Sequence, residues 1–220
     1  MSTPYSAMLP NATMMALAGN QQVRFHRLMR TSGLEIQPCM LGRIQILFGK
    51  QAMTRDKSFR GNASQFFIAG ELCRRGHAAV VTLGNTPNVD VLCSNAAGTP
   101  FAHIQVKTFE PGNRTCSVGL KAVKDFGPTF FWVLGGIPSV NSKRAFEYYV
   151  IPSSEMAKHV LEANEKWLIT PGKSNRIHQE NKMRTVHLPP YKSFSGWDIS
   201  PFRDRWDLID NILKTTPLKD

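Results

Sequence analysis

Two stretches of this sequence, Val89-Asp90-Val91-Leu92 and Ile104-Gln105-Val106-Lys107-Thr108, decide the expected fold. Both are apolar enough to form strands, and the Gly-containing segment at 95–98 between them favours a turn. Side chains alternate along a strand, so Gln105 and Lys107 share one face and the two aliphatic residues beside them point the other way. The sequence therefore predicts a hairpin that brings the aspartate, the amide and the lysine close together.

A carboxylate, an amide and an ammonium at one end of a hairpin have the chemistry to hold a divalent metal and a phosphate. Oxygen ligands suit hard ions such as Mg²⁺, and a lysine can orient a water or stabilise phosphoryl charge. The alternative is a half-solvated strand, with an aspartate that only marks the start of its neighbour. His103, on the same face as Gln105, is open to the same two interpretations.

Residues 61–77, before this hairpin, predict a helix that ends at a glycine. Asn62 or Ser64 can cap its first turn, and Gly76 can take the left-handed conformation after its last turn. A β-branched strand and a turn rich in Gly, Asn and Pro follow at 78–88. The predicted order is therefore helix, strand, Asp strand and Gln-x-Lys strand.

This order resembles that of the PD-(D/E)XK nuclease superfamily, which has the restriction-endonuclease-like fold. Its Holliday-junction-resolvase-like and uncharacterised prokaryotic members carry G-x-x-(S/A)-E on the helix, then D, then (E/Q)-V-K-T. The resemblance covers about residues 59–152, and a closing Trp-Asp-Leu segment, common in such members, stands at 206–208. It implies an α/β fold with a mixed central β-sheet flanked by α-helices.

The resemblance also implies a role for each motif residue. Asp90 would be the central metal-binding carboxylate and Gln105 the second metal-site residue. The main-chain carbonyl of Val106 would complete a site for Mg²⁺ or Mn²⁺. Lys107 would be the catalytic lysine, and Gln65 would stand at the position of the helix glutamate. The implied activity is hydrolysis of phosphodiester bonds in DNA by a metal-dependent endonuclease.

Gln105 and Gln65 are departures from the family's acidic residues, although the QVKT branch tolerates the first. Both remove negative charge, and an amide oxygen attracts Mg²⁺ less than a carboxylate does. Glu71 does not simply replace Gln65, because six residues turn an ideal helix by about 240°. Two further functions therefore stay open: a DNA-binding protein that kept the nuclease fold without its chemistry, and a protein-interaction subunit with an accidental motif.

The chain is strongly basic, with 27 Lys and Arg against 16 Asp and Glu, a net charge of +11 and a pI of about 9.8. This balance favours a polyanionic partner, here DNA. Residues 171–196 read as a long basic loop, either a DNA clamp or simply solvated. The candidate DNA-contacting residues are Thr108, which follows the lysine, and Lys173, Arg176, Lys182 and Arg184 of that loop. A homodimer stays open.

The rest of the chain predicts a strand-like segment at Cys116–Leu120 and two stronger strands near 129–134 and 146–151. A helix follows from about 152 to 163, and a final helix lies near 202–213. Ser153 or Ser154 can cap the first of these helices. The aromatic run Phe130–Trp132 either packs in the core or stacks on nucleobases.

The four cysteines are dispersed, which predicts neither a zinc site nor a disulfide framework, and favours a reducing cytoplasm. Cys73 and Cys93 lie in apolar stretches and are expected to be buried. No apolar run approaches the ~18–20 residues needed to span a bilayer. The first 23 residues contain no Lys or Arg and so lack the charged region of a signal peptide. No membrane partner is expected.

Residues 1–57 predict an N-terminal extension and residues 58–220 the nuclease-like domain. The extension is either a poorly ordered segment, an over-long start before Met53, or a small DNA-contacting arm. The arm would use Arg24, Arg27 and Arg30.

Overall fold

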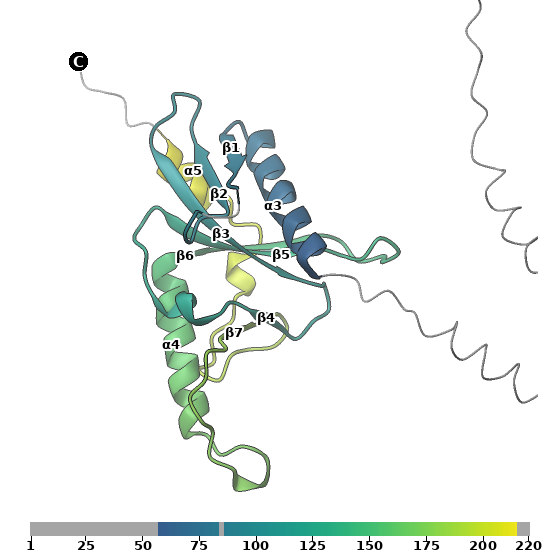
Figure 1. Ribbon diagram of the computed structural model, residues 1–220, viewed down its shortest axis with the longest axis vertical. Coiled ribbons are helices and arrows are strands. Elements are labelled where there is room, and N and C mark those ends of the chain that lie inside the picture. Colours follow the sequence, from purple (N-terminus) through teal and green to yellow (C-terminus); the bar gives the residue numbers. More distant parts are fainter. Residues whose placement is uncertain (1–56, 84–85, 215–220) are drawn as a thin grey trace, which may run out of the picture. The chain divides into compact units, whose positions relative to one another are not determined.

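The computed structural model describes residues 57–83 and 86–214 of the chain (Figure 1). The chain divides into two units, residues 1–54 and 55–220, and every described residue belongs to the second. The three arginines of the predicted arm, Arg24, Arg27 and Arg30, lie outside the described residues. The predicted role of residues 1–57 therefore stays a prediction.

A mixed five-stranded sheet, in the order β1-β2-β3-β5-β6, forms the centre of the described part (Figure 1). Its first three strands form an antiparallel meander, β5 runs parallel to β3, and β6 returns antiparallel to β5. The strands are β1 (Ala78–Val81), β2 (Val91–Ser94), β3 (Phe101–Phe109), β5 (Phe130–Gly136) and β6 (Glu147–Pro152). The predicted turn between β2 and β3 is present, with the Gly98 N–H donating to Asn95 and a Gly98 φ of 83°.

Helices cover both faces of this sheet, as Figure 1 shows. One face packs against α3 (Lys57–Arg74) and α5 (Asp207–Leu213), and the other against α4 (Ser153–Ile169). A small antiparallel pair, β4 (Thr115–Ser117) and β7 (Thr185–His187), joins the α4 side. Three short 3-10 helices complete the described part: η1 (Leu120–Val123), η2 (Lys173–Asn175) and η3 (Ser200–Phe202). The predicted fold class, α/β with a mixed sheet flanked by helices, is confirmed.

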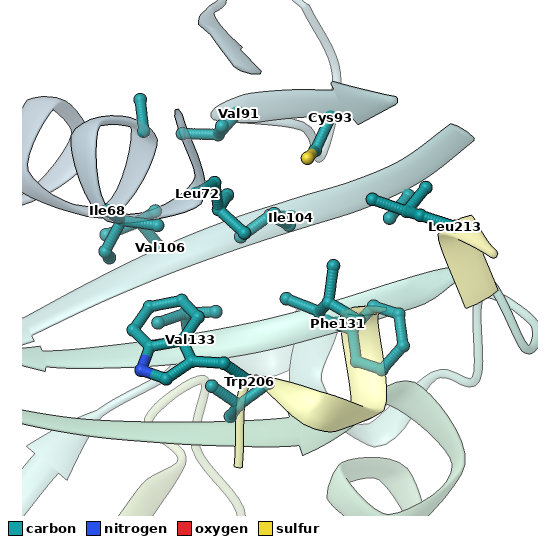
Figure 2. Packing of buried hydrophobic residues seen from close by; sticks show 14 residues of the cluster. Ile68, Leu72, Val91, Cys93, Ile104, Val106, Phe131, Val133, Trp206 and Leu213 are labelled. Atoms are coloured by element: carbon teal, nitrogen blue, oxygen red, sulfur yellow. The ribbon is translucent and has the colours of Figure 1, made fainter. Parts of the chain in front are cut away.

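The alternation of β3 divides its side chains between two cores. Ile104 and Val106 pack against Ile68 and Leu72 of α3, with Trp206 closing the same cluster (Figure 2). Gln105 and Lys107 point to the opposite face, because their register partners on β5, Trp132 and Leu134, belong to the second core under α4. The face of the sheet toward α4 therefore carries the polar residues of interest.

The predicted first helix exists, but α3 begins at Lys57, four residues earlier than expected. Asn62 and Ser64 consequently lie inside the helix, so neither caps its start. The predicted end is confirmed, since α3 stops at Arg74 and Gly76 has a φ of 91°.

Helix α4 starts where it was expected but continues to Ile169. No serine side chain caps it, because the Ser153 hydroxyl instead accepts a hydrogen bond from the Phe126 N–H. The final helix is shorter than predicted: α5 begins at Asp207, and Phe202 lies in η3 and packs on the α4 side of the sheet.

Three other predictions are corrected by burial and pairing. The segment 171–196 is not a plain loop, because β7 within it pairs with β4. The run Phe130–Trp132 is buried in β5, so the nucleobase-stacking interpretation is wrong. Cys73 is exposed on α3, whereas Cys93 is buried as expected. Within the described ranges, no helix is long and apolar enough to cross a membrane.

Candidate active site

Three residues singled out by the sequence, Asp90, Gln105 and Lys107, line the same open hollow on the surface. Its remaining walls come from the turn at 86–88 before β2 and from the segment 118–121, which crosses from β4 to η1. The hairpin therefore brings together the carboxylate, the amide and the ammonium that the sequence predicted.

Asp90 is the last residue before β2, and its main chain is fixed on both sides. The Thr82 N–H donates to the Asp90 carbonyl at 2.9 Å, and the Asp90 N–H donates to the Ile104 carbonyl at 2.8 Å. The preceding Asn88 takes a left-handed φ of 65°, a conformation that asparagine tolerates better than most residues. The turn thus ends with the carboxylate held at the edge of β3.

Beyond the last residue pair of β2 and β3, the side chain of Asp90, and not a backbone group, accepts the next N–H of β3. Its Oδ2 accepts a hydrogen bond from the Val106 N–H at 2.7 Å and another from Gln105 Nε2. Pairing of β2 with β3 runs from Val91, opposite Ile104, toward the turn, so Val106 lies beyond the paired region. The N–H and C=O of one strand residue point to the same side, so the Val106 carbonyl also faces this open edge.

This edge offers a hard cation one carboxylate, one main-chain carbonyl and one amide. Within residues 57–83 and 86–214, no group of three or more His, Cys, Asp or Glu side chains could hold a metal. Gln105 points its amide nitrogen at Asp90, so the amide must turn over to present its oxygen to a cation. The set fits Mg²⁺ in donor type, with a single negative charge from Asp90.

Lys107 adds a positive charge to the hollow beside this carboxylate. Among the described residues, neither Lys107 nor Asp90 has an ion-pair partner within 4.0 Å. Cys116 lies close enough to Lys107 to feel its charge, yet burial raises the pKa of this thiol to about 12. A neutral Cys116 leaves the lysine charge uncompensated, so Lys107 remains available to an anion.

Lys121 also lines the hollow, although no pattern in the sequence predicts it there. It stands on η1, fourteen residues after Lys107, where neither periodicity nor a motif marks it. Only the path of the chain between β3 and β5 brings it to the site. The described residues of the hollow therefore include two ammonium groups and one carboxylate, a net positive charge that suits a phosphodiester.

Gln65 is not brought to this hollow with the other three residues. It lies on α3, which packs on the sheet face of Ile104 and Val106, whereas Gln105 and Lys107 belong to the opposite face. Glu71, also on α3, is engaged by Arg74 and Arg75, and the hydrogen bond from Arg74 holds its pKa below the usual range. His103 and Thr108 of β3 do not line the hollow either.

The predicted basic clamp residues have two different environments. Lys173, Arg176 and Lys182 are exposed, as a DNA-contacting loop requires. Arg184 is buried, with 7% exposure, and its terminal nitrogens donate to the Glu180 carboxylate and to the carbonyls of Asn181 and Met183. Arg184 therefore does not stand on the surface, where the loop interpretation put it.

The sequence matches no family model and no curated protein. Among solved structures, a bacterial homing endonuclease, I-Ssp6803I, is similar at 17% sequence identity and a TM-score of 0.42. The match covers 71% of this chain and 93% of that chain. A likeness this weak does not bear on the activity of the chain, which has to be inferred from the site itself.

Proposed function

We propose that this protein is a metal-dependent DNA endonuclease and that the hollow of Asp90, Gln105 and Lys107 is its active site. The observation that carries the proposal is that these residues, from two strands, line one hollow. The hollow lies where β3 continues beyond its pairing with β2 and leaves a backbone edge open. The order helix, strand, Asp strand and Gln-x-Lys strand, on which the resemblance to PD-(D/E)XK nucleases rests, supports the same function.

In this proposal Asp90, the Gln105 amide oxygen and the Val106 carbonyl hold Mg²⁺ or Mn²⁺. When bound, a divalent cation neutralises charge on the scissile phosphate and makes the attacking water more acidic. Lys107 orients that water or stabilises the charge that develops on the phosphoryl oxygens. Lys121, at the same hollow, contacts a phosphate of the strand.

The basic charge of the chain supports DNA as the substrate. Phosphate contacts supply most sequence-independent affinity, so a net charge of +11 favours binding of a DNA backbone. The exposed Lys173, Arg176 and Lys182 provide further positive charge for a longer stretch of DNA. Binding is expected to weaken as the salt concentration is raised, because releasing counterions from DNA into a more concentrated salt solution gains less entropy.

A second candidate function, a DNA-binding protein without catalysis, is favoured by one specific contact. Gln105 Nε2 donates to Asp90, so the amide and the carboxylate satisfy each other without a cation. The helix that would contribute a second acidic residue carries Gln65, which does not line the hollow. This protein would bind DNA equally well with and without Mg²⁺.

Isothermal titration with Mn²⁺ separates the two functions. The nuclease proposal expects Mn²⁺ binding by the wild-type protein that disappears in Asp90→Asn, because this change removes the one carboxylate among the described residues that line the hollow. Asp204→Asn is the matched control, since Asp204 is exposed in a positive-φ turn that asparagine also accepts. Absence of binding, or equal binding by Asp90→Asn, would eliminate the metal site and leave the inert DNA-binding protein.

A further inference from the structure

A second cavity, of about 250 Å³, lies between α4 and the β4–β7 pair. Trp167, Val160 and Ala163 form its wall on α4, and Met183 and Phe194 contribute from the segment around β7. Most of the surface inside the cavity is apolar. A cavity of this size and composition suits a small planar ligand rather than a whole nucleotide or peptide.

Two buried polar atoms belong to residues that line this cavity, Arg184 Nε and His187 Nδ1, and neither has a hydrogen-bond partner within the described part of the chain. The other nitrogens of Arg184 are already bonded to Glu180, Asn181 and Met183, which fixes the guanidinium in place. Buried donors and acceptors in folded proteins are rarely left unpaired, because the lost hydration is not replaced. The pair indicates a ligand with a hydrogen-bonding edge.

His187 is suited to such an edge because it stays uncharged. Burial, and then the charge of Arg114, lower the pKa of His187. A neutral imidazole has one donor and one acceptor nitrogen, and its tautomer can adapt to the group that it meets. The ring of Phe194 stands edge-on to His187, at 6.0 Å between centroids, and adds an apolar wall.

The cavity and the candidate active site share a wall. The Val118 and Gly119 N–H groups, at 2.9 and 3.3 Å, donate to the carbonyl of Arg184. Val118 and Gly119 line the hollow of Lys107, while Thr115, three residues earlier, lines the cavity. A ligand in the cavity would therefore lie beside a DNA strand that has one of its phosphates in the hollow.

We propose that the cavity binds an unpaired nucleobase of the DNA strand held at the hollow, an inference that rests on the proposed function. A nucleobase has apolar faces, which fit between Trp167 and Phe194. It also has a polar edge, which accepts a hydrogen bond from Arg184 Nε and forms a second hydrogen bond with His187 Nδ1. Met183 is exposed and flexible, so its side chain can move to admit the base.

The same segment provides both exposed cations and the buried Arg184. Lys173 and Arg176 line a neighbouring surface hollow on the same segment, and its His178 stacks on Trp167 with centroids 4.1 Å apart. The exposed cations contact phosphates around the base, while Arg184 contacts the base itself.

The test uses a variant that fills the cavity without removing a polar group. Ala163→Leu places a larger side chain in the cavity from α4 and keeps high helix propensity. Ala145→Leu, at an exposed position outside the cavity, is the matched control. The probes are a single-stranded DNA oligonucleotide and an abasic strand of the same length, so that both carry equal phosphate charge.

The wild-type protein is expected to bind the base-containing strand about five- to hundredfold more tightly than the abasic strand, the range for one stacked base. Ala145→Leu keeps this ratio, and Ala163→Leu reduces it toward one while leaving affinity for the abasic strand unchanged. Arg184→Lys, which keeps the charge beside Glu180 but loses the Nε–H, also lowers the ratio. A wild-type ratio of one, or an unchanged ratio in a folded Ala163→Leu protein, overturns the inference.

Cleavage is measured on the same proteins to separate this inference from the proposed function. DNA cleavage without any preference for bases overturns the base site alone. A preference for bases without cleavage overturns the nuclease and leaves the base site standing. If neither strand binds, the base site is overturned, whereas the nuclease is overturned only if duplex DNA is not cut.

Discussion

Gln105 is 8% exposed and donates its amide hydrogen bond to Asp90, so each group satisfies the other inside the edge of the sheet. A glutamate at this position would leave two carboxylates side by side without a donor between them. Like charges at short range raise the free energy of the state in which both are ionised. The amide is therefore the more stable choice in the metal-free protein, and a carboxylate the better one for a cation.

Gln105→Glu is expected to lower the stability of the metal-free protein and to increase its stabilisation by a cation. Without metal, the variant loses about 1–3 kcal/mol of unfolding free energy, because a buried hydrogen bond is replaced by carboxylate repulsion. With Mn²⁺, its melting temperature rises more than that of the wild type, because the site then has two negative ligands. Thermal unfolding with and without Mn²⁺ measures both effects.

Gln179→Glu, which adds the same charge at an exposed position, is the control for net charge. A Gln105→Glu protein as stable as the wild type and insensitive to Mn²⁺ would show that Asp90 and Gln105 do not form a cation site.

At the scale of elements, α3 sits directly on β5 because a glycine and a small serine meet between them. A Cβ added at Gly135 would clash with the Ser64 hydroxyl of α3. That hydroxyl is fully buried and has no hydrogen-bond partner among residues 57–83 and 86–214. The close approach of the two elements therefore depends on both residues being small.

Ser64→Ala is expected to raise the unfolding free energy by about 1 kcal/mol, because it removes an unpaired buried hydroxyl without leaving a large void. Gly135→Ala is expected to lower it by about 1–3 kcal/mol through overpacking. The double variant recovers part of this loss, because the clashing oxygen is gone. Urea unfolding of the four proteins measures the coupling. If the two changes add independently, the helix and the strand are not in the close contact described.

The elements that the sequence predicted well have a local signal. The alternation along β3 and the glycine after α3 lie within a few consecutive residues, and both were expected. A strand was predicted near β4, at Cys116–Leu120, but its pairing with β7 had no such signal, because β7 has only three residues and lies about seventy residues further along the chain. The wall of the hollow formed by residues 118–121 depends on the same pairing, so it was missed as well.

In the candidate site too, the residues that were predicted correctly are those close together in the sequence. Asp90 directly precedes β2, and Gln105 and Lys107 lie on the neighbouring β3, so spacing alone was enough to bring them together. Gln65 lies on α3, which packs on the opposite face of the sheet from Gln105 and Lys107, and no sequence pattern predicts this. Arg184 was expected in a solvated loop because its neighbours are polar, whereas the pairing of β7 draws it inward.

At the largest scale, the described residues contain a five-stranded sheet with helices on both faces (Figure 1). A chain that starts at Met53 is therefore expected to be soluble, to unfold cooperatively and to keep the hollow of Asp90 and Lys107. Circular dichroism during urea unfolding, compared with the full chain, measures this. Insolubility, or a loss comparable with the about 5–15 kcal/mol that stabilises a whole domain, would contradict it.

The most direct test of the proposed function is DNA cleavage by the full chain with Mg²⁺ or Mn²⁺, compared between Lys107→Ala and Lys158→Ala. The control removes the same charge from an exposed position on α4 that lines neither the hollow nor the base cavity. We expect the wild type and Lys158→Ala to cut DNA and Lys107→Ala to be slower by about 100-fold or more, with DNA binding retained. Failure of the wild type to cut supercoiled, linear or branched DNA, or equal cleavage by Lys107→Ala, would contradict the proposed active site.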